Sequence, residues 1–256
     1  MTLLPAIRRP FAGLRRFAAG MADLFFPPIC SSCDEDLGPN YDDSRLCETC
    51  RDGLTEVPTF RCPKCAARVA ITFQDGDCPW CRTHDLRFDG TFTLGTYHDA
   101  LREVVLRSKY GGSEPLVAAA TKLLLHRWEE PLRAAQIDLV VPIPMYWTRR
   151  LRRGHCGPEI AAQVIARHLG VADYPRLLKR QRNTQPQVGL SINQRRDNVH
   201  RAFGVRRPSR VVGKRVLLVD DVLTTGATCS EAARELKRVG ASFVAVAVLA
   251  RAQGET

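Results

Sequence analysis

Eight cysteines, arranged as four Cys-x-x-Cys pairs in the first third of the chain, restrict the fold of that region more than any other feature. A Cys-x-x-Cys pair holds both sulfurs on one tight turn, and here 11 to 13 residues separate each pair from the next. Two such pairs surround a tetrahedral ion, so we expect two zinc ions, each about 2.3 Å from four thiolates. The pairs are Cys30/Cys33, Cys47/Cys50, Cys62/Cys65 and Cys78/Cys81.

Other arrangements of these cysteines stay open. Iron–sulfur clusters usually have tighter or less symmetric spacing, and four successive pairs are not the pattern of a thioredoxin-like redox site. His84 is an alternative ligand three residues after Cys81. Sequential pairing needs the shortest loops and makes two adjacent ribbons, whereas an interleaved pairing is the alternative. Cys156 and Cys229, outside the pairs, are predicted to be small buried thiols in a reducing cytoplasm.

Composition indicates a globular chain rather than a disordered, collagen-like or membrane-spanning one. The 256 residues are 45% hydrophobic and 25% charged, which is enough for a full core in one or two domains. No uncharged stretch exceeds twelve residues, so we expect no membrane span. Residues 1–28 are apolar and rich in arginine. They are predicted to form an amphipathic helix that packs on the protein itself or on a membrane or partner surface.

Charge is distributed unevenly along the chain. The net charge is +11, but residues 1–90 carry −2 and residues 91–256 carry +13. Residues 149–215 alone hold 17 Lys and Arg against three acidic residues. This segment indicates an anionic partner, either a phosphorylated metabolite or a nucleic acid.

The sequence pattern changes after the last cysteine pair, and we expect residues 29–90 to form a double zinc ribbon and residues 91–256 a second domain. In the second domain, continuous apolar runs alternate with segments of helical periodicity. This alternation is typical of an α/β fold with a doubly wound, mostly parallel sheet. The runs predict strands at residues 92–97, 138–142, 214–219 and 243–249, and helices at 101–106, 116–124, 160–169 and 232–239.

The most informative segment of this domain is residues 216–228, where an apolar strand meets two adjacent aspartates and a turn of small hydroxylated residues opens a helix. Backbone N–H groups of such a turn, aided by the helix N-terminus, can wrap a phosphate. The carboxylates of Asp220 and Asp221 can accept hydrogen bonds from ribose hydroxyls or hold Mg²⁺. One alternative is an ordinary strand–turn–helix with surface acids. A phosphoacceptor receiver domain needs more chain than the 35 residues that follow Asp221.

The string Asp-Asp-x-x-Thr-Thr-Gly-x-Thr at 220–228 resembles the phosphoribosyl-pyrophosphate (PRPP) motif of type I phosphoribosyltransferases. Together with the four cysteine pairs, the chain resembles the ComF family over nearly its full length. Further similar positions are Phe26-Pro27, Lys109-Tyr110, Val141-Pro-Ile-Pro144, Arg149–Gly154, Arg182-x-Thr184-x-x-Gln187-x-x-Leu190, Arg195, Asn198 and Ala202-Phe203. Where the family commonly has an aromatic, an Asn and a Gln after Arg153-Gly154, this chain has His155-Cys156-Gly157.

The resemblance implies a fold of the type I phosphoribosyltransferase kind and a set of site residues. Mg²⁺ is expected to accompany PRPP, and Asp220 and Asp221 are the expected catalytic pair. PRPP is expected at Asp220, Asp221, Thr224, Thr225, Gly226, Ala227 and Thr228, and its pyrophosphate near Pro142, Ile143, Pro144, Arg149, Arg153 and Arg195.

Two functions follow as hypotheses. In the first, the protein transfers a phosphoribosyl group from PRPP, or uses a related sugar phosphate, with an unknown acceptor. In the second, a non-catalytic module keeps the fold and binds nucleic acid, in particular single-stranded DNA alongside DNA-uptake proteins, because ComF relatives are associated with natural competence. The polar stretch 181–201 is either a mobile lid over the site or a solvated basic loop.

Overall fold

The computed structural model describes residues 27–38, 41–55, 60–70, 78–148, 157–185 and 189–252. Nearly all of the predicted N-terminal helix at residues 1–28 lies outside these ranges, as do Arg149, Arg153 and Cys156. The proposed division of the chain at residues 28 and 90 stays a prediction. None of the described helices is both long and apolar enough to cross a lipid bilayer.

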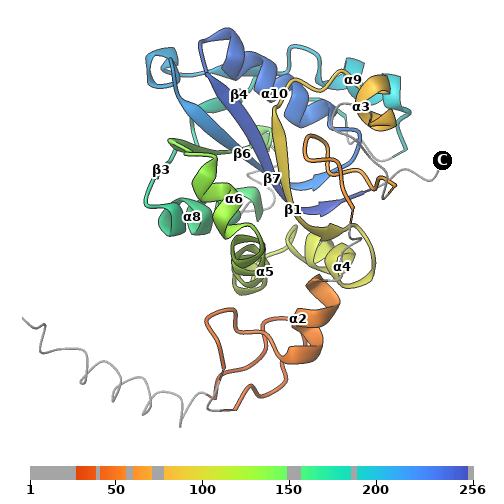
Figure 1. The fold of residues 1–256 in the computed structure, drawn as a ribbon, viewed down its shortest axis with the longest axis vertical. Coiled ribbons are helices and arrows are strands. Elements are labelled where there is room, and N and C mark those ends of the chain that lie inside the picture. The colour runs from red at the N-terminus through yellow and green to blue at the C-terminus, as the bar shows by residue number, and fades with distance from the viewer. Residues whose placement is uncertain are drawn as a thin grey trace, which may run out of the picture.

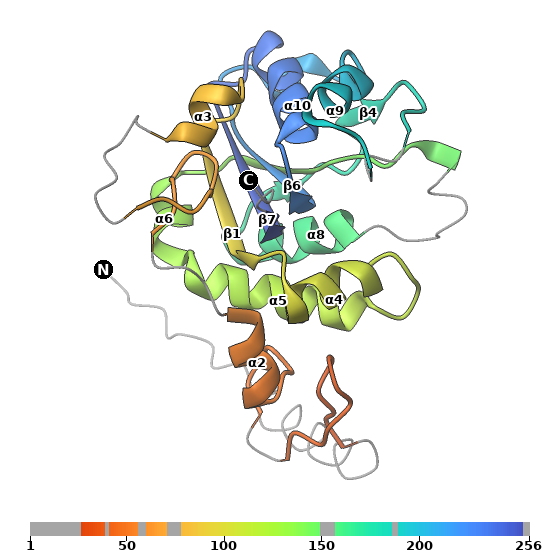
Figure 2. The same cartoon turned by 90° about the vertical axis from the view of Figure 1, so that its right-hand side faces the viewer.

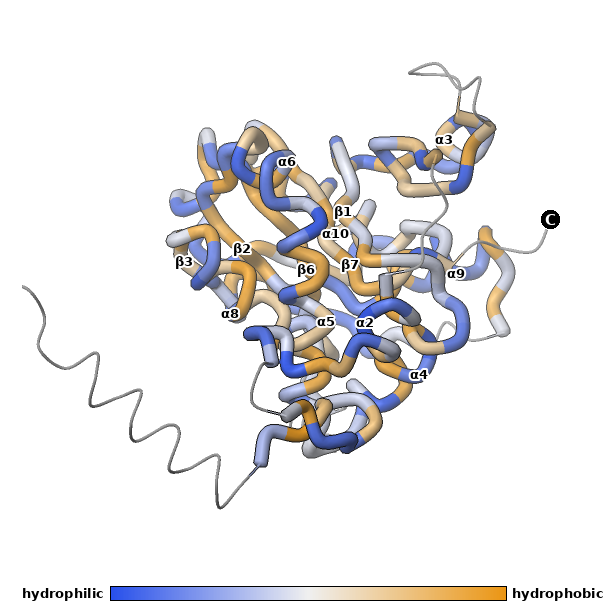
Figure 3. The backbone as a smooth tube through the Cα atoms, turned by 60° about the horizontal axis from the view of Figure 1, so that its bottom comes forward, coloured by the Kyte–Doolittle hydropathy of each residue, from blue (hydrophilic) through white to orange (hydrophobic). Residues whose placement is uncertain are grey.

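A five-stranded sheet forms the centre of the molecule, and every pairing in it is parallel. The predicted α/β class with a mostly parallel sheet is therefore confirmed, and Figure 3 shows hydrophobic positions along these strands. The strand order is β1 (Gly90–Thr96), β7 (Phe243–Arg251), β6 (Arg215–Leu223), β2 (Leu139–Pro142) and β3 (Ala172–Asp173).

The sheet divides the hydrophobic core into two parts. Successive residues of a strand point to opposite faces, so Leu217 and Val219 of β6 join one part and Val216 and Leu218 join the other. Different helices pack on the two faces, and the long ones are easily followed in Figure 1. They are α4 (Asp99–Arg107), α5 (Glu114–Arg127) and α8 (Gly157–Leu169) on the first, and α10 (Ala227–Arg238) on the second. The short helix α6 (Glu129–Ala134) follows α5.

A small second sheet lies beside α10. It consists of β4 (Leu178–Arg180) and β5 (Phe203–Val205), paired antiparallel, with helix α9 (Ile192–Val199) between them in sequence and the 3-10 turn η1 (Pro208–Arg210) after them. The predicted lid or loop at 181–201 thus contains a regular helix. Its first turn is closed by a capping box, in which the Ser191 hydroxyl accepts from the Gln194 amide and the Gln194 side chain accepts from the Ser191 amide.

The two cysteine ribbons are built alike. In each, the first Cys-x-x-Cys pair forms a turn whose backbone closes on itself, with Asp34 N donating to Cys30 O and Ala66 N donating to Cys62 O. The second pair of each ribbon lies at the start of a short helix, α2 (Glu48–Thr55) or α3 (Pro79–Thr83). The local geometry therefore repeats, although the two stretches share little besides their cysteines.

The ribbons do not lie side by side, contrary to our expectation of adjacent ribbons. The first packs beneath α4 and α5 (Figures 1 and 2), whereas the second lies against β1, where Thr91 donates from its backbone N to Pro63 O and from its hydroxyl to Lys64 O. Cys30 and Leu54 belong to one part of the core, and Cys62 and Cys65 belong to the other. Each ribbon has too few apolar residues for a core of its own, so each completes a different face of the sheet.

Candidate functional site

The eight paired cysteines form two tetrads, and the pairing is sequential. Within each tetrad, the four sulfurs lie within 4.8 Å of one another. Sulfur–sulfur distances are 3.7 Å for Cys33 and Cys47 and 3.6 Å for Cys65 and Cys78. Four sulfurs at about 2.3 Å from one ion stand about 3.8 Å apart, whereas a disulfide needs about 2.05 Å. The tetrads therefore fit structural zinc, and they are Cys30, Cys33, Cys47, Cys50 and Cys62, Cys65, Cys78, Cys81.

The alternative ligand His84 is not part of the second tetrad. Its ring stacks on Trp80 with 4.0 Å between the centroids, and its Nδ1 lies 3.0 Å from the Trp80 carbonyl oxygen. Cys229, predicted to be a buried thiol, is buried.

A cleft of about 530 Å³ opens at the carboxyl ends of the central strands, which is where ligands bind in open α/β sheets. Most of the predicted PRPP residues line it, together with Ile143 and Arg195 from the predicted pyrophosphate side. Thr225 faces a second cavity instead, and neither Pro142 nor Pro144 is in the lining of the cleft. The predicted residues in the lining are Asp220, Asp221, Thr224, Gly226, Ala227 and Thr228.

The two aspartates lie within strand β6, not after its end as the sequence pattern predicted. The strand continues to Leu223 because β7 pairs with it along this length, with Asp220 opposite Val248 and Val222 opposite Ala250. Neighbouring side chains of a strand point to opposite faces. Asp220 lies on the α10 side, where its Oδ2 is 3.8 Å from the Cys229 Sγ.

The electrostatics of the aspartate pair favour a cationic or hydroxyl-bearing ligand. Burial, and then the neighbouring charge of Asp221, raise the pKa of the Asp220 carboxyl well above its ordinary value. Each carboxylate uses one oxygen locally, since Asp220 Oδ1 accepts from Asp221 N and Asp221 Oδ1 accepts from Val222 N. Asp220 Oδ2 faces the Cys229 thiol, whereas Asp221 Oδ2 is directed to no partner among the described residues and can accept from a sugar hydroxyl or bind Mg²⁺.

The turn after β6 has the geometry of an anion site. Gly226 precedes the first residue of α10 with φ +81°, a left-handed conformation that glycine adopts without strain. The Thr225 hydroxyl accepts a 3.4 Å hydrogen bond from the Ala227 amide. The first amides of a helix have no acceptor inside the helix and carry partial positive charge. In the twelve-residue helix α10 these amides lie at the cleft.

Four basic side chains line the same cleft, and only one of them is among the site residues predicted above. They are Arg195 of α9, Arg102 of α4, Lys109 after α4, and Arg180 at the end of β4. Arg102 and Arg180 were not predicted as site residues, because they lie far from the aspartates along the chain. A signal for Arg180 is its place at the end of a strand, directly before the polar stretch. Four cations against two carboxylates make the cleft suited to a polyanion.

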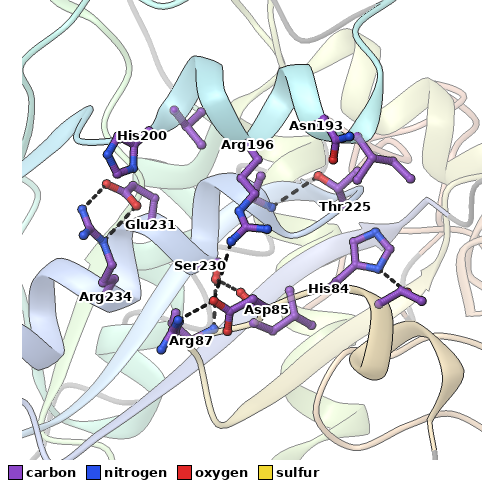
Figure 4. A pocket seen from close by; sticks show the side chains of 15 residues that line it. His84, Asp85, Arg87, Asn193, Arg196, His200, Thr225, Ser230, Glu231 and Arg234 are labelled. Carbon is purple, nitrogen blue, oxygen red and sulfur yellow. Dashed lines mark hydrogen bonds and ion pairs between the residues drawn. The ribbon is translucent and has the colours of Figure 1, made fainter.

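A second cavity, of about 250 Å³, lies on the other side of the turn (Figure 4). The segment after α3 forms one wall and helices α9 and α10 form the others. Its charges are paired among themselves: Arg87 with Asp85, and Arg234 with Glu231, whose Oε1 and Oε2 accept at 2.6 and 3.0 Å. This cavity therefore carries less unpaired charge than the cleft.

Two protein-family models match this chain, each over a different part of it. Residues 159–256 match the phosphoribosyl transferase domain, and residues 21–83 match the double zinc ribbon domain, which includes all of the paired cysteines. The chain is 28% identical to competence protein F of Haemophilus influenzae over 232 residues, covering 89% of this chain and 99% of that protein.

Other relatives cover similar shares. DNA utilization protein YhgH of Salmonella typhimurium is 29% identical over 231 residues, 89% of this chain and 99% of the relative. Competence protein ComFC of Streptococcus pneumoniae is 26% identical over 216 residues, 82% of this chain and 89% of the relative. Among solved structures, an allosteric regulatory enzyme of purine biosynthesis gives a TM-score of 0.38 at 20% identity, over 56% of this chain and 30% of that one.

Proposed function

Because the chain belongs to the ComF family, which joins a double zinc ribbon to a phosphoribosyltransferase-like domain, we propose that it binds PRPP and transfers the phosphoribosyl group. The observation that carries this proposal is the cleft, in which a glycine turn, a helix N-terminus, two carboxylates and four cations meet. The acceptor of the phosphoribosyl group stays unassigned. Relatives are named for competence and DNA utilization, so we propose that this activity serves the uptake of DNA or the use of the DNA taken up.

In this proposal, the turn from Thr224 to Thr228 holds the 5′-phosphate with its backbone amides. Asp220 and Asp221 accept hydrogen bonds from the ribose hydroxyls. Mg²⁺ bound together with PRPP would supply positive charge that neutralises the pyrophosphate. The carboxylates are the only acidic side chains in the described lining of the cleft, so they are also the residues that would hold this ion.

In this proposal, the cations of the cleft bind the pyrophosphate end of the ligand. Cleavage of the bond between the anomeric carbon and pyrophosphate places negative charge on the leaving group, and guanidinium groups aimed there stabilise that charge. Arg102, Arg180 and Arg195 are the described candidates. The predicted Arg149 and Arg153 lie outside the described residues and keep their proposed role on sequence grounds.

Calorimetric titration with PRPP and Mg²⁺ tests the proposal, using the double variant Asp220→Asn/Asp221→Asn. We expect its affinity to fall roughly a hundredfold or more, since each hydrogen bond to a charged group contributes about 1.5–3 kcal/mol. Asp173→Asn is the matched control, because Asp173 ends the edge strand β3, which β2 separates from β6, and lies outside the lining of the cleft. Equal affinities of the double variant and the wild type would make the aspartates structural. Release of pyrophosphate from PRPP by the wild type then separates transfer from binding.

A second candidate function is binding of single-stranded nucleic acid along the small second sheet. Arg201, Arg206 and Arg207 are exposed there and form no ion pair with any other described residue. Unpaired arginines on one surface favour contact with a phosphate backbone. Two basic residues of the described part of 149–215 are paired, Arg196 with Asp85 at 3.9 Å and Lys214 with Asp138 at 3.3 Å.

A further inference from the structure

Arg251, the last residue of β7, is a fully buried cation for which the proposed chemistry has no use. Its side chain has no exposed surface. Among the residues that the structure describes, no carboxylate forms an ion pair with it, and its Nη2 has no hydrogen-bond partner. A buried guanidinium without an opposing charge is strongly unfavourable. The fold must therefore provide negative charge near Arg251 by another route.

The second cysteine tetrad provides that charge. Arg251 Nε donates to the Cys65 carbonyl oxygen at 2.9 Å, and its guanidinium lies over the Trp80 ring, 4.8 Å from the centroid. Trp80 lies between Cys78 and Cys81 in the sequence, so both contacts tie the guanidinium to segments that carry cysteines of this tetrad. Four thiolates around one zinc ion leave a net charge of about −2. Burial lowers the pKa of Arg251, whereas the charges of Cys65, Cys78 and Cys81 raise it.

The other edge of the same guanidinium reaches the turn of the cleft. Nη1 donates to the carbonyl oxygens of Leu223 at 2.9 Å and of Thr224 at 2.5 Å, and also to that of Ala252. Leu223 and Thr224 are the two residues that lead from β6 into the turn. A planar guanidinium holds its donors in fixed directions, so it fixes the carbonyls on both of its edges relative to one another.

The segment that follows the second tetrad supports the same turn from the side. Gly226 lies against Leu86 and Phe88, and the Ser230 hydroxyl of α10 donates to Asp85 O while accepting from Arg87 N, both at 2.9 Å. Among the described residues, no such link joins the first tetrad to the turn. The corresponding arginine of that tetrad, Arg107, donates from Nη1 to the Ser32 carbonyl oxygen at 2.7 Å and belongs to α4.

We propose that Arg251 is a positioning residue that couples zinc occupancy of the second tetrad to the conformation of the 223–228 turn. With zinc bound, the negative tetrad stabilises the buried cation, which in turn holds the two carbonyls. When zinc leaves, the cysteine turn that presents the Cys65 carbonyl is no longer held in place, so Arg251 loses one anchor and the 223–228 turn loses its support. The link is reciprocal, so order in the turn also favours zinc retention. Only the effect of this coupling on phosphate binding at the turn rests on the function proposed above.

The test uses the full-length, zinc-loaded protein without PRPP and compares Arg251→Met with Arg107→Met. Hydrogen exchange of residues 223–230 reports the turn, and alkylation of each cysteine in the presence of a chelator, followed by mass spectrometry, reports each tetrad. In Arg251→Met, we expect exchange at 223–230 and alkylation of Cys62, Cys65, Cys78 and Cys81 to accelerate about tenfold or more. Arg107→Met is expected to accelerate alkylation of the first tetrad alone.

Arg251→Lys covers the case in which the Met variant does not fold. It keeps the charge beside the tetrad, but one ammonium group cannot reach the carbonyls on both edges. We expect faster exchange at 223–230 with alkylation near that of the wild type. Unchanged exchange at 223–230 in both Arg251 variants, or equal acceleration in Arg107→Met, would overturn the coupling. Because neither readout needs PRPP, that result is independent of whether the cleft binds it.

Discussion

A methyl group on Gly226 would come within 2.8 Å of the Leu86 Cδ2, in addition to forcing a side chain into a left-handed conformation at φ +81°. Gly226→Ala therefore combines backbone strain with a steric clash against the segment after the second ribbon. We expect a loss of about 2–5 kcal/mol in the free energy of unfolding, from strain of about 1–2 kcal/mol and overpacking of about 1–3 kcal/mol. Denaturant unfolding measures it.

Gly213→Ala separates the two contributions. Gly213 has φ +71° with nothing within 4 Å of the added methyl group, so its substitution should cost the strain alone. Equal losses in the free energy of unfolding for the two variants would show that the Leu86 side chain moves aside without loss of stability. If the clash is real, adding Leu86→Ala to Gly226→Ala should cost less than Leu86→Ala costs in the wild type.

The aspartate pair predicts a dependence of stability on pH. The pKa of Asp220 is raised in the folded protein, so between its ordinary value of about 3.9 and the raised value the folded state binds more protons than the unfolded one. Its contribution to stability therefore falls as pH rises through that range. Asp220→Asn removes the buried charge, and we expect its Tm without ligand to exceed that of the wild type at pH 8 by more than at pH 5.5. A wild type whose Tm at pH 8 is higher than that of Asp220→Asn would contradict this prediction.

The two tetrads predict two zinc ions per chain in protein purified without added metal, measured by elemental analysis. Cys33→Ser and Cys62→Ser should each release one ion, because each removes one of four thiolates from a different site. Since the ribbons join different parts of the core, we expect Cys33→Ser to accelerate hydrogen exchange near α2 and α4, and Cys62→Ser near α3 and α10. One zinc per chain in the wild type, or iron in place of zinc, would contradict the assignment.

The nucleic-acid candidate predicts a linear fall in the logarithm of affinity for a single-stranded oligonucleotide with the logarithm of salt concentration. The slope should be about −0.7 for each phosphate neutralised. Replacing Arg201, Arg206 and Arg207 with Gln should flatten the slope, as should replacing Arg149, Arg150, Arg152 and Arg153. Arg133→Gln is the control, because Arg133 is exposed on α6 and paired with Glu129 at 2.7 Å. No retention of the oligonucleotide by wild type at low salt would reject this function.

The sequence pattern was sufficient for the parts of the fold that depend on local rules. Cysteine spacing determines which sulfurs share a turn, and continuous apolar runs determine buried parallel strands, so the tetrads and the α/β class were predictable. The end of β6 was not, because the residues from Asp220 to Leu223 look like a polar loop until β7 pairs with them. Helix α9 has too few apolar residues for a periodic signal, although its Ser191-x-x-Gln194 capping box was visible.

The cations of the cleft show the other limit of sequence reasoning. Arg102 and Arg180 belong to different elements, and only the sheet topology brings them to the aspartates. Arg251 follows an apolar run as one charged residue, and nothing local indicates that its partners lie in a cysteine turn 186 residues earlier. The opposite placement of the ribbons was likewise hidden, because spacing along the chain carries no information about the face of a sheet.

That placement also determines how the chain can be divided in the laboratory. Cys30 and Leu54 pack into one part of the hydrophobic core, and Cys62 and Cys65 pack into the other. Removing the cysteine-rich third would therefore expose hydrophobic surface on both faces of the remaining sheet. A truncated transferase-like half should therefore aggregate when produced alone. Chain breaks that preserve solubility are better sought in surface loops of the second half, where cutting leaves both parts of the core covered.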